Sequence, residues 1–175
     1  MTDIVPSVSR EDYDVLRSIK EIVLHPKQFF ATMPVNGSFR QPLIFALSIS
    51  VAVGLLVCIT QSKPFIGIPA FIILYIISMF IGAGLLWLIA KLAGGTGSYK
   101  ATFRASAYCN VVSLVAWIPY VGFWATFYEL WLLILGVQRA QNLSFKAACC
   151  VVLIPFFILF TTGIVLGLLM MPHLH

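Results

Sequence analysis

The chain has 175 residues, of which 61% are hydrophobic and 10% are charged. A soluble domain carries roughly 25% charged residues. This composition, with a mean hydropathy of +1.00, therefore indicates an integral membrane protein with the lipid bilayer as its partner. The net charge of +5 comes from basic residues that flank apolar stretches, and this distribution argues against nucleic acid as a partner.

The first 40 residues are predicted to form a short amphipathic cytoplasmic segment. Ser9-Arg-Glu-Asp12 resembles a capping box, in which a serine and an acidic residue satisfy the first backbone N–H groups of a helix. Apolar residues then recur at helical spacing, opposite Arg17, Lys20 and Glu21. They are Leu16, Ile19, Ile22 and Val23, followed by Phe29, Phe30 and Met33. Two interpretations stay open: helices that lie on the cytoplasmic leaflet, and a cap that packs onto the membrane bundle.

Long uncharged stretches in residues 41–175 predict an all-α integral membrane protein with five transmembrane helices. A span needs about 20 apolar residues at a rise of about 1.5 Å each. One long stretch is interrupted by Trp117-Ile-Pro-Tyr-Val-Gly122, whose proline, glycine and aromatic residues predict a turn at the membrane surface. Pro155 is expected to kink the last span. The predicted spans are 43–62, 69–92, 99–117, 119–138 and 145–171.

Lys and Arg are distributed unevenly between the two sides of these five spans. With five spans, the N-terminal segment shares one side with the second and fourth loops. That side carries every basic residue of the chain except Lys63. Because cytoplasmic loops carry an excess of Lys and Arg, the N-terminus is predicted to be cytoplasmic and the C-terminus outside.

Glu129 is the only acidic residue after position 21, and it falls near the middle of the predicted fourth span. An ionisable group at that depth is costly unless it is paired or protonated. If the turn lies between residues 118 and 119, Tyr108 has the same depth as Glu129, and Asn110 is about 3 Å off it. The third span also carries a polar stripe at helical spacing, formed by Thr102, Ser106, Asn110 and Ser113. We therefore predict that the stripe faces the fourth span and that Asn110 or Tyr108 hydrogen-bonds to Glu129.

Two roles are open for Glu129. In the structural interpretation its contact joins two helices and contributes about 0.6–2 kcal/mol. In the functional interpretation it lines a polar pathway and changes its protonation state. A pathway needs polar residues on three or more helices, and the other spans offer only scattered Ser, Thr and Tyr residues. The structural interpretation is therefore favoured.

Two patterns of small residues predict close contacts between helices. Gly163 and Gly167 form a GxxxG pattern in the last span, and Ser78 and Gly82 form a small-xxx-small pattern in the second. Such contacts can lie within one bundle or between the copies of a homo-oligomer.

Lys91, Lys100 and Arg104 flank a glycine-rich loop at 93–98. The loop is not a phosphate loop, because no GKS or GKT sequence follows it and no strand precedes it. The three basic residues either hold anionic lipid headgroups or serve only to set the membrane topology.

Motifs for catalysis, metal binding or cofactor binding are absent from the sequence. The four cysteines lie within apolar runs and are expected to behave as small buried hydrophobic residues. We therefore predict a non-enzymatic protein without metal or cofactor, which acts as a scaffold for other membrane proteins or organises the bilayer. Two alternatives are a small transporter or channel that uses Glu129 as a proton or cation site, and a lipid-handling protein that uses Lys91, Lys100 and Arg104.

Five segments occur in an order and at a spacing that are similar to a known family. They are His25-Pro-Lys-Gln-Phe-Phe30, Leu92-Ala-Gly-Gly-Thr-Gly-Ser-Tyr99, Tyr99-Lys-Ala-Thr-Phe-Arg-Ala-Ser-Ala-Tyr108, Trp117-Ile-Pro-Tyr-Val-Gly122 and Leu135-Gly-Val-Gln-Arg-Ala-Gln-Asn-Leu-Ser-Phe-Lys-Ala147. Together they resemble the Yip domain family, named for Ypt/Rab-interacting proteins, over about residues 22–171. The family often has a proline shortly after the tyrosine of the third span, where this chain has Cys109-Asn-Val-Val112, so the break that this proline causes in the family does not carry over to this chain.

The resemblance implies five spans with a cytoplasmic N-terminus. Eukaryotic members have longer hydrophilic N-termini and act with Rab-type GTPases and partner Yip proteins in vesicle trafficking. The N-terminus of this chain, about 40 residues, is more similar to that of a prokaryotic member. The implied location is a bacterial cytoplasmic membrane, and a trafficking role is not transferred.

Overall fold

A computed structural model describes residues 15–60 and 67–170, with side chains described as far as 166. The predicted capping box at residues 9–12 lies outside these ranges. Within them, all regular secondary structure is helical. The elements are α1 (Val15–Leu24), α2 (Pro26–Thr32), α3 (Arg40–Thr60), α4 (Ile68–Leu92), α5 (Tyr99–Cys109), the 3₁₀ turn η2 (Asn110–Val112), α6 (Ser113–Ala116), α7 (Val121–Gln141) and α8 (Phe145–Met170).

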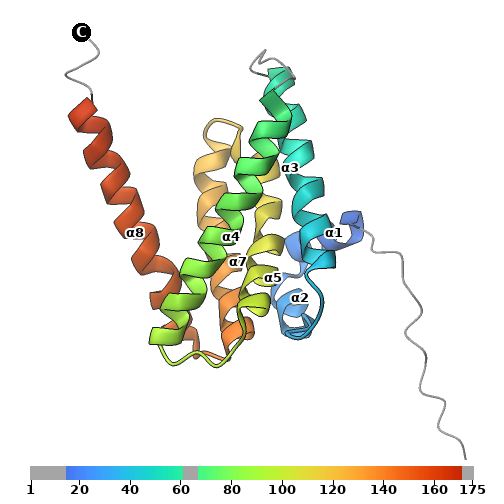
Figure 1. Cartoon of the computed structure of the whole chain (residues 1–175), viewed down its shortest axis with the longest axis vertical. Coiled ribbons are helices and arrows are strands. Elements are labelled where there is room, and N and C mark those ends of the chain that lie inside the picture. Colours follow the sequence, from blue (N-terminus) through green and yellow to red (C-terminus); the bar gives the residue numbers. More distant parts are fainter. Residues whose placement is uncertain (1–14, 61–66, 171–175) are drawn as a thin grey trace, which may run out of the picture.

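Helix α5 lies at the centre of the bundle, in contact with α3, α4 and α7 (Figure 1). Its small residues allow this close packing, because Ala101, Ala105 and Ala107 are all almost completely buried. Phe103, also fully buried, stacks against Phe80 of α4 with ring centroids 4.4 Å apart. The helix that the sequence predicts as an ordinary span is therefore the core of the molecule.

Four helices in the described ranges are long and apolar enough to cross a membrane: α3, α4, α7 and α8. They correspond to the predicted first, second, fourth and fifth spans. The predicted third span over 99–117 is helical from Tyr99 to Ala116, but it is not one regular α-helix, because the 3₁₀ turn η2 lies between α5 and α6. Asn110 caps the C-terminal end of α5. Its side-chain amide donates a hydrogen bond to Met79 Sδ of α4 at 3.0 Å. Asn has a low helix propensity, so the break needs no proline.

The chain turns between α6 and α7 in the segment where the sequence predicts a turn. Tyr120 adopts a positive φ of 65° in this turn. Gly122 follows, and a Cβ atom at this position would overlap the backbone carbonyl of Ala116. Helix α7 consequently begins at Val121, two residues later than the predicted start at 119.

Helix α8 packs on the bundle along its first half only. Ala148, Val151 and Val152 are buried against α4 and α7. Beyond Pro155, which lies inside the helix as predicted, every residue from Phe157 to Leu166 is exposed. Figure 1 shows α8 diverging from α4 toward its C-terminal end.

The two N-terminal helices pack against the side of the bundle. Ile22 of α1 and Phe30 of α2 are buried in the same cluster as residues of α3, α5 and α7. The Tyr128 hydroxyl of α7 donates to the carbonyl oxygens of Ile22 and Val23, at 3.3 and 3.0 Å, and so holds the C-terminal end of α1. Contacts with the bundle agree with the interpretation of a packed cap.

Candidate functional site

A cavity of about 270 Å³ separates the outer part of α8 from α4, α5 and α7. Its walls are mainly apolar, and its polar members are Ser106, Asn110 and Glu129. The lining is completed by Met79, Gly82, Ala83, Leu85, Leu86, Leu130, Leu133, Val152, Pro155, Phe156 and Leu159. Three of the five polar residues predicted as an intramembrane group therefore share one cavity.

Glu129 is half-buried at this cavity, and its carboxyl group makes no hydrogen bond or salt bridge with the described part of the chain. The predicted hydrogen bond from Asn110 or Tyr108 is not formed. The Asn110 amide donates to Met79 Sδ instead. The Tyr108 ring packs edge-on against Phe29 and Phe45, with centroids 5.0 and 5.2 Å away.

The predicted hydrogen bond fails because the prediction compared only the depths of the residues in the membrane and not the directions of their side chains around the helices. Residues 108 and 110 are two positions apart on a helix, so their side chains point about 200° apart. Tyr108 consequently faces α2 and α3, whereas Asn110 faces α4 and the cavity. The two residues cannot both face Glu129.

The predicted polar stripe divides between two neighbouring helices. At its lower end, the Thr102 hydroxyl accepts a hydrogen bond of 2.6 Å from the side chain of Gln141 in α7. At its upper end, Ser113 shares a 3.0 Å hydrogen bond with Tyr75 of α4. Between them, the buried Ser106 hydroxyl has no partner in the described residues. Gln141 is fully buried, although its position in a polar helix end suggests contact with solvent, so the sequence does not predict its role.

Arg104 does not belong to a lipid-binding set. Its side chain is only 3% exposed, and its guanidinium donates to the backbone carbonyls of Pro34, Asn36 and Ser38. Arg104 therefore anchors the segment between α2 and α3 and is not available to a headgroup. The other two members of the predicted set, Lys91 and Lys100, are exposed, and Lys100 Nζ lies 5.5 Å from the ring centroid of Phe39.

The predicted small-residue contacts have no counterpart inside the described bundle. A Cβ atom added at Gly82 or Gly163 would meet nothing within 4 Å. Ser78 is exposed, and its hydroxyl donates to the carbonyl of Tyr75 in its own helix. The surroundings of Gly167 lie outside the described side chains. Contacts of these residues with another copy stay a prediction.

The glycine-rich loop closes onto the end of α7. The Thr96 N–H donates to the Gln141 carbonyl at 3.0 Å, and the Asn142 side chain donates to Thr96 Oγ1 at 3.3 Å. A Cβ atom at Gly97 would overlap the Ala140 carbonyl oxygen. The segments 92–99 and 135–147, which both resemble the Yip family, therefore pack against each other. The glycines of the loop allow this close packing and do not form a phosphate site.

Groups that could carry metal or thiol chemistry are not assembled in the described ranges. There, no three His, Cys, Asp or Glu residues come together in a way that could hold a metal ion. All four cysteines are free, and Cys150 is exposed although the sequence predicts burial.

Comparison with known proteins gives a family. No curated protein and no solved structure matches the chain. The family model of the Yip1 domain matches residues 20–167, which include every helix from α2 to α7, the second half of α1 and most of α8. The match covers most of the chain, and it begins and ends within a few residues of the range of the motif resemblance. This chain belongs to the Yip1 domain family.

Proposed function

We propose that this protein is a non-enzymatic membrane scaffold that binds a transmembrane helix of another membrane protein. The observation that carries the proposal is the cavity at Glu129, which exists because α8 leaves the bundle beyond Pro155. The exposed apolar face of α8 and the apolar walls of the cavity suit a helix that lies in lipid. If the bundle had no partner to bind, the outer half of α8 would be expected to pack against α4 and α7.

The polar groups in the cavity favour a helical partner over lipid tails. Glu129 and Ser106 lack partners in the described chain, and unsatisfied polar groups are costly in hydrocarbon. A partner helix with Ser, Thr, Asn or Gln at the matching depth would donate hydrogen bonds worth about 0.6–2 kcal/mol each. A lipid acyl chain has no donor to offer.

Site-specific photocrosslinking in native membranes tests this proposal. A crosslinking residue at Leu159, which lines the cavity and is 65% exposed, is expected to give a discrete protein adduct. The matched control is Ile59 on α3, which is 69% exposed and lies away from the cavity. An adduct with twice the mass of the chain would identify a homo-oligomer. The absence of a protein adduct at Leu159, or the same adducts at both positions, would contradict the proposal.

Transport through Glu129 is the second candidate function. It is favoured by the same carboxyl group, which opens onto a cavity without an ion pair among the described residues. The test is flux of protons or cations into liposomes with the wild-type protein and with Glu129→Gln. Flux that the substitution abolishes would support transport, and equal flux, or flux no higher than in empty liposomes, would exclude it.

The proposed topology has five passes, with the N-terminus in the cytoplasm of a bacterial cell. The segment α5–η2–α6 would be the third pass, packed between α3, α4 and α7. Support comes from charge, because Arg40, Lys91, Lys100, Arg139 and Lys146 all lie at helix ends on one side of the bundle (Figure 1). The exposed Leu16, Val23 and Leu24 of α1 would then contact the cytoplasmic leaflet.

A further inference from the structure

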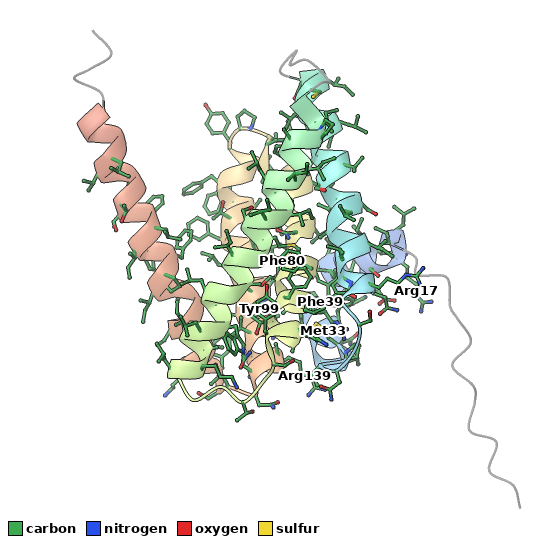
Figure 2. The ribbon with its side chains drawn as sticks, viewed as in Figure 1. Arg17, Met33, Phe39, Phe80, Tyr99 and Arg139 are labelled. Atoms are coloured by element: carbon green, nitrogen blue, oxygen red, sulfur yellow. The ribbon has the colours of Figure 1, made fainter. Side chains whose placement is uncertain are left out.

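A second cavity, of about 690 Å³, lies between α2, the C-terminal half of α7 and the beginning of α8. Two cationic side chains and several aromatic rings line it together. The residues that matter here are Lys27, Phe30, Trp131, Gln138, Arg139 and Phe145. Arg139 marks the end of the bundle at which it lies (Figure 2). Lys27 and Arg139 come from two separate segments that resemble the Yip family, and only the tertiary structure brings them together.

The two cations of this cavity lack a neutralising carboxylate in the described ranges. Only two acidic residues fall there: Glu21 pairs with Arg17, and Glu129 lines the other cavity. Lys27 Nζ instead lies 5.8 Å from the ring centroid of Trp131. Both Lys27 and Arg139 are exposed to the surroundings of the bundle. Two positive charges beside the same cavity attract an anion.

The partial negative charge at the C-terminal end of α7 does not prevent an anion from binding in this cavity. A helix C-terminus carries partial negative charge on its last carbonyl groups. Here the Gln138 carbonyl accepts the Leu143 N–H at 3.2 Å, and the Gln141 carbonyl accepts the Thr96 N–H at 3.0 Å. Arg139 in the last turn offsets the remaining dipole. Phe145, the first residue of α8, adds the positive end of a second helix to the cavity wall.

The donor set suits a phosphate group. The guanidinium of Arg139 can bind two phosphate oxygens at once, and Lys27 supplies a compact charge. Gln138 adds an amide donor that makes no hydrogen bond of its own within the described chain. The aromatic residues Phe30, Trp131 and Phe145 would be superfluous for inorganic phosphate, but they match the glycerol and upper acyl groups of a phospholipid.

The position of the cavity agrees with the level of lipid headgroups. Helix α1 exposes Lys20 and bears the Arg17–Glu21 pair, so it cannot lie within hydrocarbon. Helix α2 follows α1 directly and lines the cavity through Lys27 and Phe30. Arg139, in the last turn of α7, lines the cavity from the other side.

We propose that the Lys27–Arg139 cavity binds the phosphate group of an anionic phospholipid, with the acyl chains directed along Trp131 and Phe145. This proposal concerns a different cavity from the one at Glu129, and it holds whether or not a partner helix binds there.

The test is lipid-dependent thermal stabilisation of the purified full-length chain in an uncharged detergent. Phosphatidylglycerol, phosphatidylcholine with the same acyl chains and inorganic phosphate are titrated separately, and each gives an apparent affinity. Phosphatidylglycerol is expected to stabilise the wild-type protein more strongly than the other two. The double variant Lys27→Gln, Arg139→Gln should bind phosphatidylglycerol about 25-fold more weakly, at roughly fivefold for each charge.

The matched control is Lys91→Gln, Lys100→Gln, which removes the same charge from positions that are also exposed but lie outside the cavity, and it should leave the affinity almost unchanged. The variant Lys27→Arg, Arg139→Lys keeps both charges and should keep most of the binding. Equal stabilisation by the two lipids on the wild-type protein would overturn the proposal, even if the Gln variant failed to fold. The proposal would also be overturned if the control variant lost as much affinity for phosphatidylglycerol as the double Gln variant. If inorganic phosphate stabilised the wild-type protein as strongly as phosphatidylglycerol, the assignment to a lipid would be overturned.

Discussion

At the scale of single residues, Arg104 changes role between the sequence and the structure. In the sequence it is one of three cations beside a glycine-rich loop. In the structure it is buried and its guanidinium holds the carbonyls of the 34–38 segment. Its two terminal nitrogens donate to these carbonyls, while the buried Nε has no partner in the described residues. The sequence gives no sign of backbone acceptors 66 to 70 residues away.

Replacement of Arg104 should destabilise the fold. We expect Arg104→Met to lower the free energy of unfolding by about 3 kcal/mol, because it removes charged hydrogen bonds and leaves backbone carbonyls unpaired. Thermal unfolding in detergent measures the change. Arg40→Met, at an exposed position, is the control and should stay within about 0.5 kcal/mol of wild type. Equal stability of the two variants would contradict the role of Arg104 as an anchor.

Gly97 gives a second prediction at this scale. Gly97→Ala places a methyl group on the Ala140 carbonyl and should force the loop away from α7, at a cost of about 1–3 kcal/mol. Gly163→Ala, where a Cβ atom meets open space, should not destabilise the monomer, because alanine favours the helix. The two variants are compared by thermal unfolding. A tolerated alanine at 97 would show that the loop contact is not needed.

At the scale of elements, the interruption after α5 decides where the polar groups point. Thr102, Asn110 and Ser113 would lie along one face of an unbroken helix. The break at η2 accompanies a division of their contacts between α7 and α4. Helical spacing therefore identified the polar residues of this segment that make contacts between helices, but it predicted only α7 as their partner and not α4.

Helix α1 should depend on one hydroxyl group for its position. Tyr128→Phe removes the hydrogen bonds to the Ile22 and Val23 carbonyls and leaves the ring in place. We expect faster hydrogen exchange of the α1 amides, with a loss of only about 1 kcal/mol in overall stability. Tyr120→Phe is the control, because Tyr120 is 90% exposed. Unchanged exchange in α1 would mean that apolar packing alone holds the helix.

At the scale of the whole molecule, the number of passes decides on which sides the two termini lie. If α5–η2–α6 crosses the membrane, the N-terminus and the C-terminus lie on opposite sides. We expect a C-terminal alkaline phosphatase fusion to be active in a bacterial host and a C-terminal green fluorescent protein fusion to be dark. An N-terminal fluorescent fusion should be bright. Both termini on the same side would contradict five passes.

The sequence alone determined the class of the molecule, the positions of the four long helices, the turn before α7 and the family. These features follow from local hydropathy, from proline and glycine, and from motifs that are contiguous in the chain. The direction of each side chain around its helix depends on how helices are rotated against each other. For that reason only the tertiary structure decided that Tyr108 faces away from Glu129, that Arg104 is buried, and that Lys27 and Arg139 share one cavity.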